Sequence, residues 1–518
     1  MQVIESFDRG ADAFPDRACF VLADGSRSWS FREIQTLSHR IGAALARDGF
    51  GEGSKVAVLS PNDPVAFTAL LGALRINATW VALNAKSTPQ DNADLLETVE
   101  CDVLVYHPKL AAAADLAEGQ VASLRTCISL LPGGRDGDPV LDDWMEPEGT
   151  QVPLVPDRPE AVAMMLGTGG TTGRPKAVQI THRGIQQMNL AFLAHLPEQD
   201  PVQLVAAPMS HAAGGITFCV FAVGGTHIIH DGVVPKDIFE SIERHKVTRL
   251  FLPPTAIYAL LAHPDVRSHD FSSLRHFIYA AAPMSVDKLK ESMEVFGPVM
   301  TQTFGQAEAP MICTVLTPRD HVEALESGRE ERLASCGRPS VVATVRIMDD
   351  DGTILGPGEK GEIVVRGDLV MPGYYKDPEQ SEAVRRPGGW HGTGDIGQMD
   401  EDGFVSIVDR KRDMIISGGF NVFPSEVEQV IWGHPAVNDC AVIGLPDEKW
   451  GESVTAVVEL KPGQEVEADE LVKLCRDRLG PVKTPKTVIF RELPRSPVGK
   501  VLKRELRDEF WSGRARAV

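Results

Sequence analysis

The chain has 518 residues, of which 43% are hydrophobic and 24% charged, and it contains no low-complexity tract or obvious repeat. This composition excludes a disordered or fibrous protein, and the length exceeds what one hydrophobic core usually serves, so we expect two or more domains. The net charge of -20 argues against binding to nucleic acid or to anionic membranes, because a polyanion requires a basic face.

The cysteines and the N-terminus indicate where the protein works. Eight cysteines lie scattered at positions 19, 101, 127, 219, 313, 336, 440 and 475, without CxxC spacing, which is typical of reduced thiols in a cytoplasmic protein. The opening MQVIESFDRGADAFPDR lacks the basic start and apolar run of a signal peptide, and Ser210 and His211 interrupt the apolar stretch near 204–229. We therefore expect a cytoplasmic location and no membrane-spanning segment.

Strand and helix patterns alternate in the first part of the chain. The run of segments is KVAVLSP (55–61), PVAFTALLGALRI (64–76), WVALN (80–84), DNADLLETV (91–99) and DVLVYHP (102–108). The same rhythm returns in VTRLFLPP (247–254), TAIYALLAH (255–263) and LRHFIYAAAP (274–283). This alternation predicts βαβ units and at least two layers of mostly parallel sheet.

The pattern changes twice in the second part. TVRIMDDDGTILGPGEKGEIVVRG (344–367) has the alternation and Gly- or Asp-centred turns of antiparallel hairpins, which predicts a smaller β subdomain. A charged run at 410–413 precedes a new series, with helices at 425–434 and 468–479 and strands at 439–446 and 453–462. We therefore predict an α/β protein with a large domain over 1–410 and a small α+β domain over 411–518.

LGTGGTTGRPKAV (166–178) leaves the apolar run AVAMM through glycines and threonines. Glycine lets successive backbone N–H groups turn toward an anion, and the threonine hydroxyls and Lys176 add further donors. Phosphate is therefore the expected ligand. Arg174 and Pro175 separate Gly173 from Lys176, which breaks the register of a Walker P-loop. A flexible surface turn is the alternative.

Six further segments occur with this one in a fixed order. They are PMSHAAGG (208–215), YAAAP (279–283), QTFGQAE (302–308), WHGTGD (390–395), VDRKRDMIISGGFNVFPSEVE (408–428) and PRSPVGK (494–500). Together the seven resemble the motif series of the adenylate-forming acyl-CoA synthetase superfamily over nearly the whole chain. The resemblance implies a mobile C-terminal domain and two half-reactions, in which a carboxylate attacks ATP to give acyl-AMP and pyrophosphate, and a thiol then displaces AMP.

The first half-reaction brings two anions together. A carboxylate is already a nucleophile at neutral pH, so the step requires positioning and a cation rather than a base. By resemblance Lys500 is that cation, reaching the carboxylate and the α-phosphate; the alternative is an exposed lysine on a turn.

The resemblance also assigns the nucleotide site. Implied phosphate ligands are Thr168, Gly169, Gly170, Thr171, Thr172, Gly173 and Lys176. Glu308 would hold Mg²⁺ with Thr168 as a second oxygen ligand, and Asp395 and Arg410 would bind the ribose hydroxyls. The walls of an adenine slot would be Phe304 and the backbone of Ala281, Ala282 and Pro283, with Gln302 and Thr303 at its edge. The alternatives are a cap or surface role for Glu308, surface charges at Asp395 and Arg410, and a core ring for Phe304.

Further residues concern the acid and CoA. His211 resembles the residue at the acyl-pocket entrance, where it would position the acid and not act as a base, and the small residues 212–215 suggest room for a sizeable substrate. Arg412 would be the hinge of the domain rotation. Gly418 and Gly419 would let the pantetheine arm of CoA pass close to the backbone, and Trp450 and Lys486 would contact the CoA nucleotide. The alternatives are a structural role for His211 and a solvated charge run around Arg412. For Trp450 the alternative is a place in the core of the small domain, and for Lys486 a place on its surface.

Two positions depart from the family pattern. Gly169 and Ala307 each replace a residue that usually carries a hydroxyl, and each lost hydrogen bond costs about 1 kcal/mol. Ala177 replaces a common glycine at a point where a helix can begin.

The sequence therefore predicts an ATP- and Mg²⁺-dependent acid:CoA ligase. Loading of a carrier-protein phosphopantetheine, or arrest at acyl-AMP, is the alternative within the same chemistry, and a non-catalytic nucleotide-binding scaffold is the alternative outside it. Fatty, aromatic and alicyclic acids all stay open as substrates, and a homodimer is possible.

Overall fold

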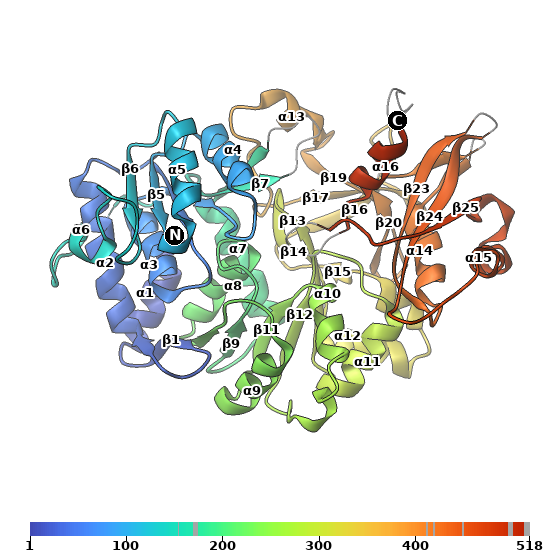
Figure 1. Cartoon of the computed structure of the whole chain (residues 1–518), viewed down its shortest axis with the longest axis horizontal. Coiled ribbons are helices and arrows are strands. Elements are labelled where there is room, and N and C mark those ends of the chain that lie inside the picture. The colour runs from blue at the N-terminus through green and yellow to red at the C-terminus, as the bar shows by residue number, and fades with distance from the viewer. Residues whose placement is uncertain are drawn as a thin grey trace.

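The computed structural model of the chain describes residues 1–153, 155–168, 175–410, 413–417, 420–447, 450–495 and 501–511, and at positions 410 and 421 the backbone alone. Figure 1 shows two large α/β layers on the N-terminal side and a smaller unit, built from the last part of the chain, at one end of the molecule.

The first layer is a six-stranded sheet. In spatial order its strands are β6 (Thr126–Ser129), β5 (Val103–Tyr106), β3 (Lys55–Leu59), β4 (Thr79–Ala82), β7 (Val162–Thr168) and β8 (Lys176–Thr181). All neighbours are parallel except β7 and β8, which form an antiparallel pair.

Helices cover both faces of this sheet. The pair α2 (Phe31–Arg47) and α3 (Pro64–Arg75) shares a core cluster with Val56 and Val58, whereas α4 (Pro89–Val99) and α5 (Ala111–Gln120) share another with Ala57 and Leu59. Because successive side chains of a strand point to opposite faces, a strand buried on both faces is apolar throughout, which explains the run KVAVL.

The second layer is a nine-stranded sheet. Its strands, in spatial order, are β15 (Arg338–Pro339), β14 (Ala309–Leu316), β13 (Met300–Gln306), β12 (His276–Tyr279), β11 (Arg249–Leu252), β9 (Val202–Val205), β10 (Thr226–Ile229), β1 (Ala18–Leu22) and β2 (Ser28–Ser30). The strands from β13 to β1 are parallel, and β2, β14 and β15 are antiparallel to their neighbours.

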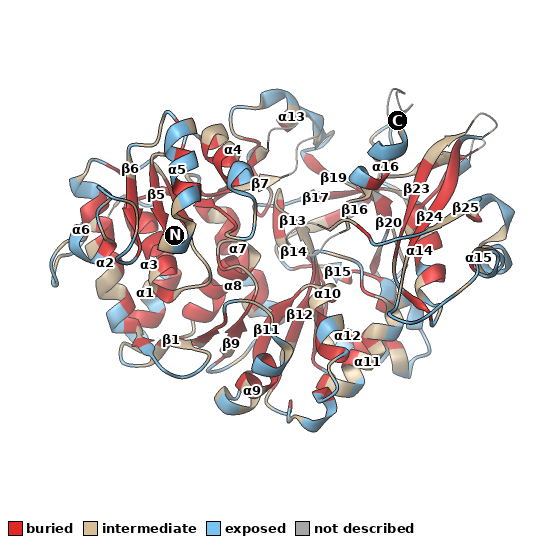
Figure 2. Ribbon diagram, in the orientation of Figure 1, coloured by how far each residue is buried: buried red, intermediate tan, exposed pale blue. Residues whose placement is uncertain are grey.

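The two layers share one core. The helices α7 (His182–His195) and α8 (Ala212–Phe221) belong to a cluster that contains residues of both sheets, and α8 is buried at every position from 213 to 221 (Figure 2). On the other face of the nine-stranded sheet lie α9 (Pro235–His245), α10 (Pro254–Leu261) and α11 (Val286–Phe296). A helix that is apolar all round, as α8 is, has to lie inside the protein.

The rest of the chain forms two antiparallel-rich sheets. The first contains β16 (Thr344–Met348), β17 (Gly361–Arg366), β18 (Arg385–Arg386), β19 (Trp390–Met399) and β20 (Val405–Arg410). The second contains β21 (Ile415–Ser417), β22 (Phe420–Val422), β23 (Val437–Asp447), β24 (Gly451–Leu460) and β25 (Thr487–Phe490). The helices α14 (Pro424–Trp432) and α15 (Ala468–Lys483) share a core cluster with the second sheet, and α16 (Lys503–Trp511) contacts β23.

These observations confirm the predicted fold class and correct one detail. The mixed α/β layers, the β subdomain and the small α+β unit all appear. No helix begins at Ala177, because this buried residue lies in β8, paired with Gly167 of β7, and the following helix begins only at His182. Within the described residues, no helix is both long and apolar enough to cross a membrane.

Candidate active site

The predicted adenine residues lie together at the ends of two neighbouring parallel strands. Tyr279 at the end of β12 pairs with Gln302 of β13, and the chain continues from β12 through Ala280 to Ala281 and Ala282. Ala281 has a φ of 72°, a left-handed conformation that is unusual for alanine. The carboxyl ends of parallel strands are the usual place for a ligand in such a sheet.

The two faces of β13 separate these residues. Gln302 and Phe304 are half-buried on one face, and Phe304 packs against the main core. Thr303 points to the other face, where it is 2% exposed and its hydroxyl has no hydrogen-bond partner in the described part of the chain. Any contact of Thr303 with a base in the slot would therefore come from its backbone and not from its side chain.

The predicted ribose residues face each other across two strands. Asp395 of β19 and Arg410 of β20 are directly opposite in an antiparallel pair, and Asp395 is 9% exposed. Side chains at opposite positions leave the same face of a sheet about 5 Å apart. The fold therefore brings a carboxylate to the neighbourhood of position 410.

Tyr374 connects the predicted metal ligand and the predicted phosphate lysine. Its hydroxyl donates a 2.7 Å hydrogen bond to Oε1 of Glu308, and the Lys176 ammonium lies 5.2 Å from the centre of its ring. Burial raises the pKa of the Tyr374 hydroxyl, and the Glu308 charge raises it further. The tyrosine therefore stays a neutral donor that holds Glu308 in one orientation.

Sequence reasoning missed Tyr374 because it lies outside every motif, 66 positions from Glu308. Within the described chain, no hydrogen bond engages the second carboxylate oxygen of Glu308. That oxygen is hard and anionic, which is the kind of ligand that Mg²⁺ prefers.

Thr168 and Lys176 flank the predicted phosphate loop. They are directly opposite in the β7–β8 pair, and Lys176 donates a 2.5 Å hydrogen bond to Oε1 of Gln380. The loop residues Gly169, Gly170, Thr171, Thr172 and Gly173 lie outside the described residues. The two strands thus fix the ends of the loop on the side of the molecule where Tyr374 lies.

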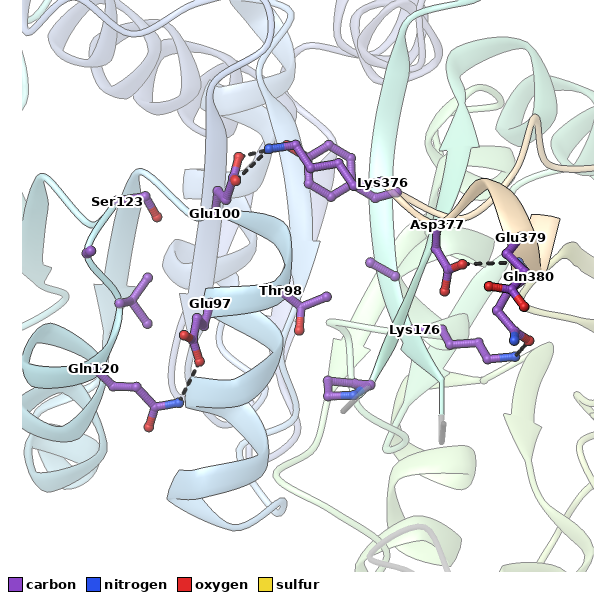
Figure 3. A pocket seen from close by; sticks show the side chains of 15 residues that line it. Glu97, Thr98, Glu100, Gln120, Ser123, Lys176, Lys376, Asp377, Glu379 and Gln380 are labelled. Carbon is purple, nitrogen blue, oxygen red and sulfur yellow. Dashed lines mark hydrogen bonds and ion pairs between the residues drawn. The ribbon is translucent and has the colours of Figure 1, made fainter. Parts of the chain in front are cut away.

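Lys176 also lines a surface hollow of about 800 Å³. Figure 3 shows Lys176 turned toward Gln380 on one wall and Lys376 bonded to Glu100 on another. The lining holds four carboxylates against two lysines. This charge balance opposes a triphosphate, so we do not assign the hollow to the nucleotide.

His211 lies at the N-terminal end of α8. Its Nδ1 is 2.9 Å from the hydroxyl oxygen of Ser210, and burial lowers the pKa of the ring to about 4. The imidazole is therefore neutral at pH 7. This agrees with a positioning role for His211, which has no proton to remove from a carboxylate.

The small residues after His211 are explained by packing. A Cβ on Gly214 would lie 1.7 Å from the carbonyl oxygen of Met209, and a Cβ on Gly215 would lie 3.2 Å from Cε of Met188. The backbone of Met209 fills the space beside Gly214, and the end of the Met188 side chain lies close to Gly215, so packing accounts for these two glycines without a substrate.

The predicted CoA residues Trp450 and Lys486 lie together on the small domain. The ammonium of Lys486 is 5.8 Å from the centre of the Trp450 ring, and the ring is 38% exposed. Phe420 is 60% exposed at the start of β22 and pairs with Ser417, itself paired with Gly451. Gly418 and Gly419 lie outside the described residues, as does Arg412.

Lys500 also lies outside the described residues, but both ends of its segment are described. Arg495 and Val501 form an antiparallel bridge. The guanidinium of Arg495 is 2.8 Å from Asp439 and 3.3 Å from Glu459. On the other side, the half-buried Lys503 has its ammonium 2.7 Å from Oε1 of Glu428. Ion pairs therefore hold both flanks of the segment that contains Lys500.

Comparison with known proteins finds two family models in this chain. The model of the AMP-binding enzyme matches residues 7–375, and the model of the AMP-binding enzyme C-terminal domain matches residues 426–500.

Curated relatives cover most of the chain. A medium/long-chain fatty-acid–CoA ligase of Mycobacterium tuberculosis is 37% identical over 91% of this chain and 84% of its own length. A feruloyl-CoA synthase of an Amycolatopsis species is 35% identical over 94% of this chain and 95% of its own.

Solved structures share the whole architecture. The amide bond synthetase McbA of Marinactinospora thermotolerans aligns with a TM-score of 0.89 at 30% identity, over 98% of this chain and 100% of its own. ATP-bound MatB of Rhodopseudomonas palustris aligns with a TM-score of 0.88 at 27% identity, over 98% and 99%.

Proposed function

The chain belongs to the AMP-binding enzyme family, and from this premise we propose that it is an AMP-forming acid:CoA ligase with ATP, CoA and a carboxylic acid as substrates. The observation that carries the proposal is the similarity to an acid–CoA ligase and an acyl-CoA synthase over more than nine tenths of the chain. The geometry supports it at three separate places: the predicted adenine residues adjoin the end of β12, Asp395 is opposite Arg410, and Thr168 is opposite Lys176.

In the first half-reaction a carboxylate oxygen bonds to the α-phosphorus of ATP while the bond from that phosphorus to the bridging oxygen breaks. Pyrophosphate leaves with the electron pair, and no proton has to move. The barrier is repulsion between anions, which a positioned cation lowers. We assign that cation to Lys500 and the positioning of the acid to His211, whose ring is neutral because burial lowers its pKa to about 4.

The residues near Tyr374 fit a magnesium ion. Glu308 and the Thr168 hydroxyl would hold it, since both offer hard oxygen atoms and ATP supplies further oxygens. When bound, the ion would neutralise phosphate charge. Asp395 and Arg410 would bind the ribose, and Gln302, Phe304, Ala281 and Ala282 the base.

In the second half-reaction the CoA sulfur bonds to the acyl carbon, AMP leaves with the electron pair of the acyl–oxygen bond, and the thiol proton passes to solvent. CoA has to enter where Lys500 was, so we propose that the small domain, residues 411–518, rotates about Arg412. Gly418 and Gly419 would then line the pantetheine path, and Trp450 and Lys486 the CoA nucleotide. A cytoplasmic location and a homodimer stay predictions; the eight buried free cysteines support the first.

The acceptor is the point at which the compared proteins differ. The two relatives are named for CoA, whereas the solved structure of McbA is named an amide bond synthetase. Adenylation is common to both outcomes, so the acceptor has to be tested separately.

A screen of carboxylic acids tests the proposal. Pyrophosphate release that depends on both the acid and ATP identifies the substrate, and AMP release stimulated by CoA identifies the acceptor. Stimulation by a carrier protein or an amine, and not by CoA, would reject the CoA ligase. No acid-dependent pyrophosphate release with fatty, aromatic or alicyclic acids would reject the adenylating activity.

A further inference from the structure

We propose that Tyr279 and His321 turn the amide of Gln302 so that its carbonyl oxygen faces the nucleotide, and that this orientation selects a purine with an amino group at C6 over one with a carbonyl there. The inference rests on the proposed function, which puts the base at Gln302. Tyr279 and His321 are positioning residues, since they would act through Gln302.

The three side chains form one chain of contacts beneath the predicted adenine site. Tyr279 and Gln302 are paired across β12 and β13, and the Tyr279 hydroxyl oxygen is 3.2 Å from Oε1 of Gln302. The same hydroxyl is 2.9 Å from Nε2 of His321, which lies on α12 (Pro318–Glu326). Both Tyr279 and His321 are 0% exposed, so water does not compete for these contacts.

The tautomer of His321 follows from its other nitrogen. Nδ1 lies 2.7 Å from the carbonyl oxygen of Thr317. A carbonyl oxygen can only accept, so Nδ1 carries a proton and donates it. Burial lowers the pKa of the ring to about 4, against a smaller opposing effect of Thr317 and Asp320. The ring is therefore neutral at pH 7, and its Nε2 is an acceptor.

The hydroxyl proton of Tyr279 is consequently used in the hydrogen bond to His321. His321 Nε2 can only accept, so Tyr279 donates to it over 2.9 Å. A hydroxyl has one proton, and the oxygen that remains is an acceptor. With the carbonyl oxygen of Gln302 at 3.2 Å, two acceptors would face each other. Exchange of the amide ends resolves the conflict, because the NH₂ group of Gln302 then donates to Tyr279.

The exchange decides what Gln302 offers to a ligand. Among the described residues, Tyr279 is the sole hydrogen-bond partner of the Gln302 amide, which is half-buried. With the NH₂ group bound to Tyr279, the carbonyl oxygen is the open end. It accepts from the amino group of adenine and opposes the carbonyl oxygen of hypoxanthine. Sites that hydrogen-bond a donor of the substrate reject analogues that lack it.

Acid-dependent pyrophosphate release with ATP and with inosine triphosphate tests the inference. We expect the wild-type kcat/KM to favour ATP, and Tyr279→Phe to lower the ATP-to-inosine-triphosphate ratio by roughly five- to tenfold, the worth of one hydrogen bond. Tyr106→Phe is the matched control, since it also removes a buried tyrosine hydroxyl, bonded to Asp138, on a different strand. It should leave the ratio unchanged.

A double-mutant cycle separates positioning from a loss of folding. Gln302→Leu removes the amide and should reduce the ratio further, and adding Tyr279→Phe to it should change the ratio no more. A merely structural role of Tyr279 would lower both activities equally in both backgrounds. If Tyr279→Phe does not fold, as checked by thermal unfolding, an unchanged ratio in the half-buried Gln302→Leu variant alone overturns the inference.

The same assay distinguishes a failure of the ligase activity from a failure of the Gln302 orientation. An enzyme that shows no acid-dependent pyrophosphate release with either nucleotide contradicts the proposed function. The other result is an enzyme that uses ATP with the same ATP-to-inosine-triphosphate ratio in wild type, Tyr279→Phe and Gln302→Leu. That result contradicts the orientation of Gln302 by Tyr279 and His321, and it does not contradict the proposed ligase activity.

Discussion

Tyr374 shows how single side chains build the phosphate side of the site. Its hydroxyl fixes one oxygen of Glu308, and its ring lies beneath the Lys176 ammonium. One residue therefore sets the distance between the group that would hold the metal and a group that would hold phosphate. A hydrogen bond to a charged acceptor is stronger than one to a neutral acceptor, so its loss should be measurable.

Tyr374→Phe keeps the ring and removes the hydroxyl. We expect the KM for ATP to rise by about five- to tenfold, and the Mg²⁺ concentration for half-maximal rate to rise with it, because Glu308 loses its fixed orientation. Steady-state pyrophosphate release over a matrix of ATP and Mg²⁺ measures both. Tyr375→Phe, which removes the neighbouring hydroxyl bonded to Glu100, is the control. Identical constants for the two variants would contradict this role of Tyr374.

At the scale of elements, ion pairs anchor the described residues on either side of 496–500 to two strands and a helix. Arg495 pairs with Asp439 of β23 and Glu459 of β24. Lys503, at the start of α16, pairs with Glu428 of α14. Burial alone would lower the Lys503 pKa, but the Glu428 and Asp409 charges outweigh it and raise the pKa, so the ammonium stays charged.

Arg495→Ala removes the anchor on one side of Lys500. Because small misplacements of a reacting group cost large factors in rate, we expect acid-dependent ATP–pyrophosphate exchange to fall roughly ten- to hundredfold. Thioester formation from supplied acyl-AMP should change little, since Lys500 acts only in the first half-reaction. Arg491→Ala, which breaks the exposed pair with Glu509, is the matched control. Equal losses in both half-reactions would show that Arg495 supports the small domain in general.

The whole molecule contains several uncharged, buried histidines. Burial lowers the pKa of His182, His230 and His321 to about 4 and that of His227 to about 3. In the unfolded chain these rings titrate near pH 6.5. Between pH 6.5 and pH 4 the unfolded chain therefore binds more protons than the folded one, and stability falls as the pH falls through this window.

We expect each buried ring to lower the free energy of unfolding by about 1 to 2 kcal/mol between pH 7 and pH 5. Urea midpoints at the two pH values measure the sum. His227→Gln should reduce the difference between the midpoints, because it removes one ring whose pKa burial lowers. A midpoint that is the same at pH 7 and pH 5 would contradict the neutral burial of these rings.

Pattern and motif predicted the layers, the β subdomain and the small C-terminal unit. They failed where tertiary packing decides. Ala177 lies in a strand because KAVQIT pairs with β7, and Gly214 is small because Met209 lies against it. The opposition of Asp395 and Arg410 depends on the register of β19 and β20, which motif order does not specify. Tyr374 and the Tyr279–His321 pair were not foreseen, since each acts on a residue distant in sequence.

The central claim is that a cation from the small domain serves one half-reaction and then gives way to CoA. Separate assays of the two half-reactions in Lys500→Ala test it most directly, with Arg412→Pro as the reciprocal variant. We predict that Lys500→Ala abolishes acid-dependent ATP–pyrophosphate exchange while thioester formation from supplied acyl-AMP stays near the wild-type rate, and that Arg412→Pro impairs the CoA step more than exchange. Equal loss of both half-reactions in Lys500→Ala would contradict the account.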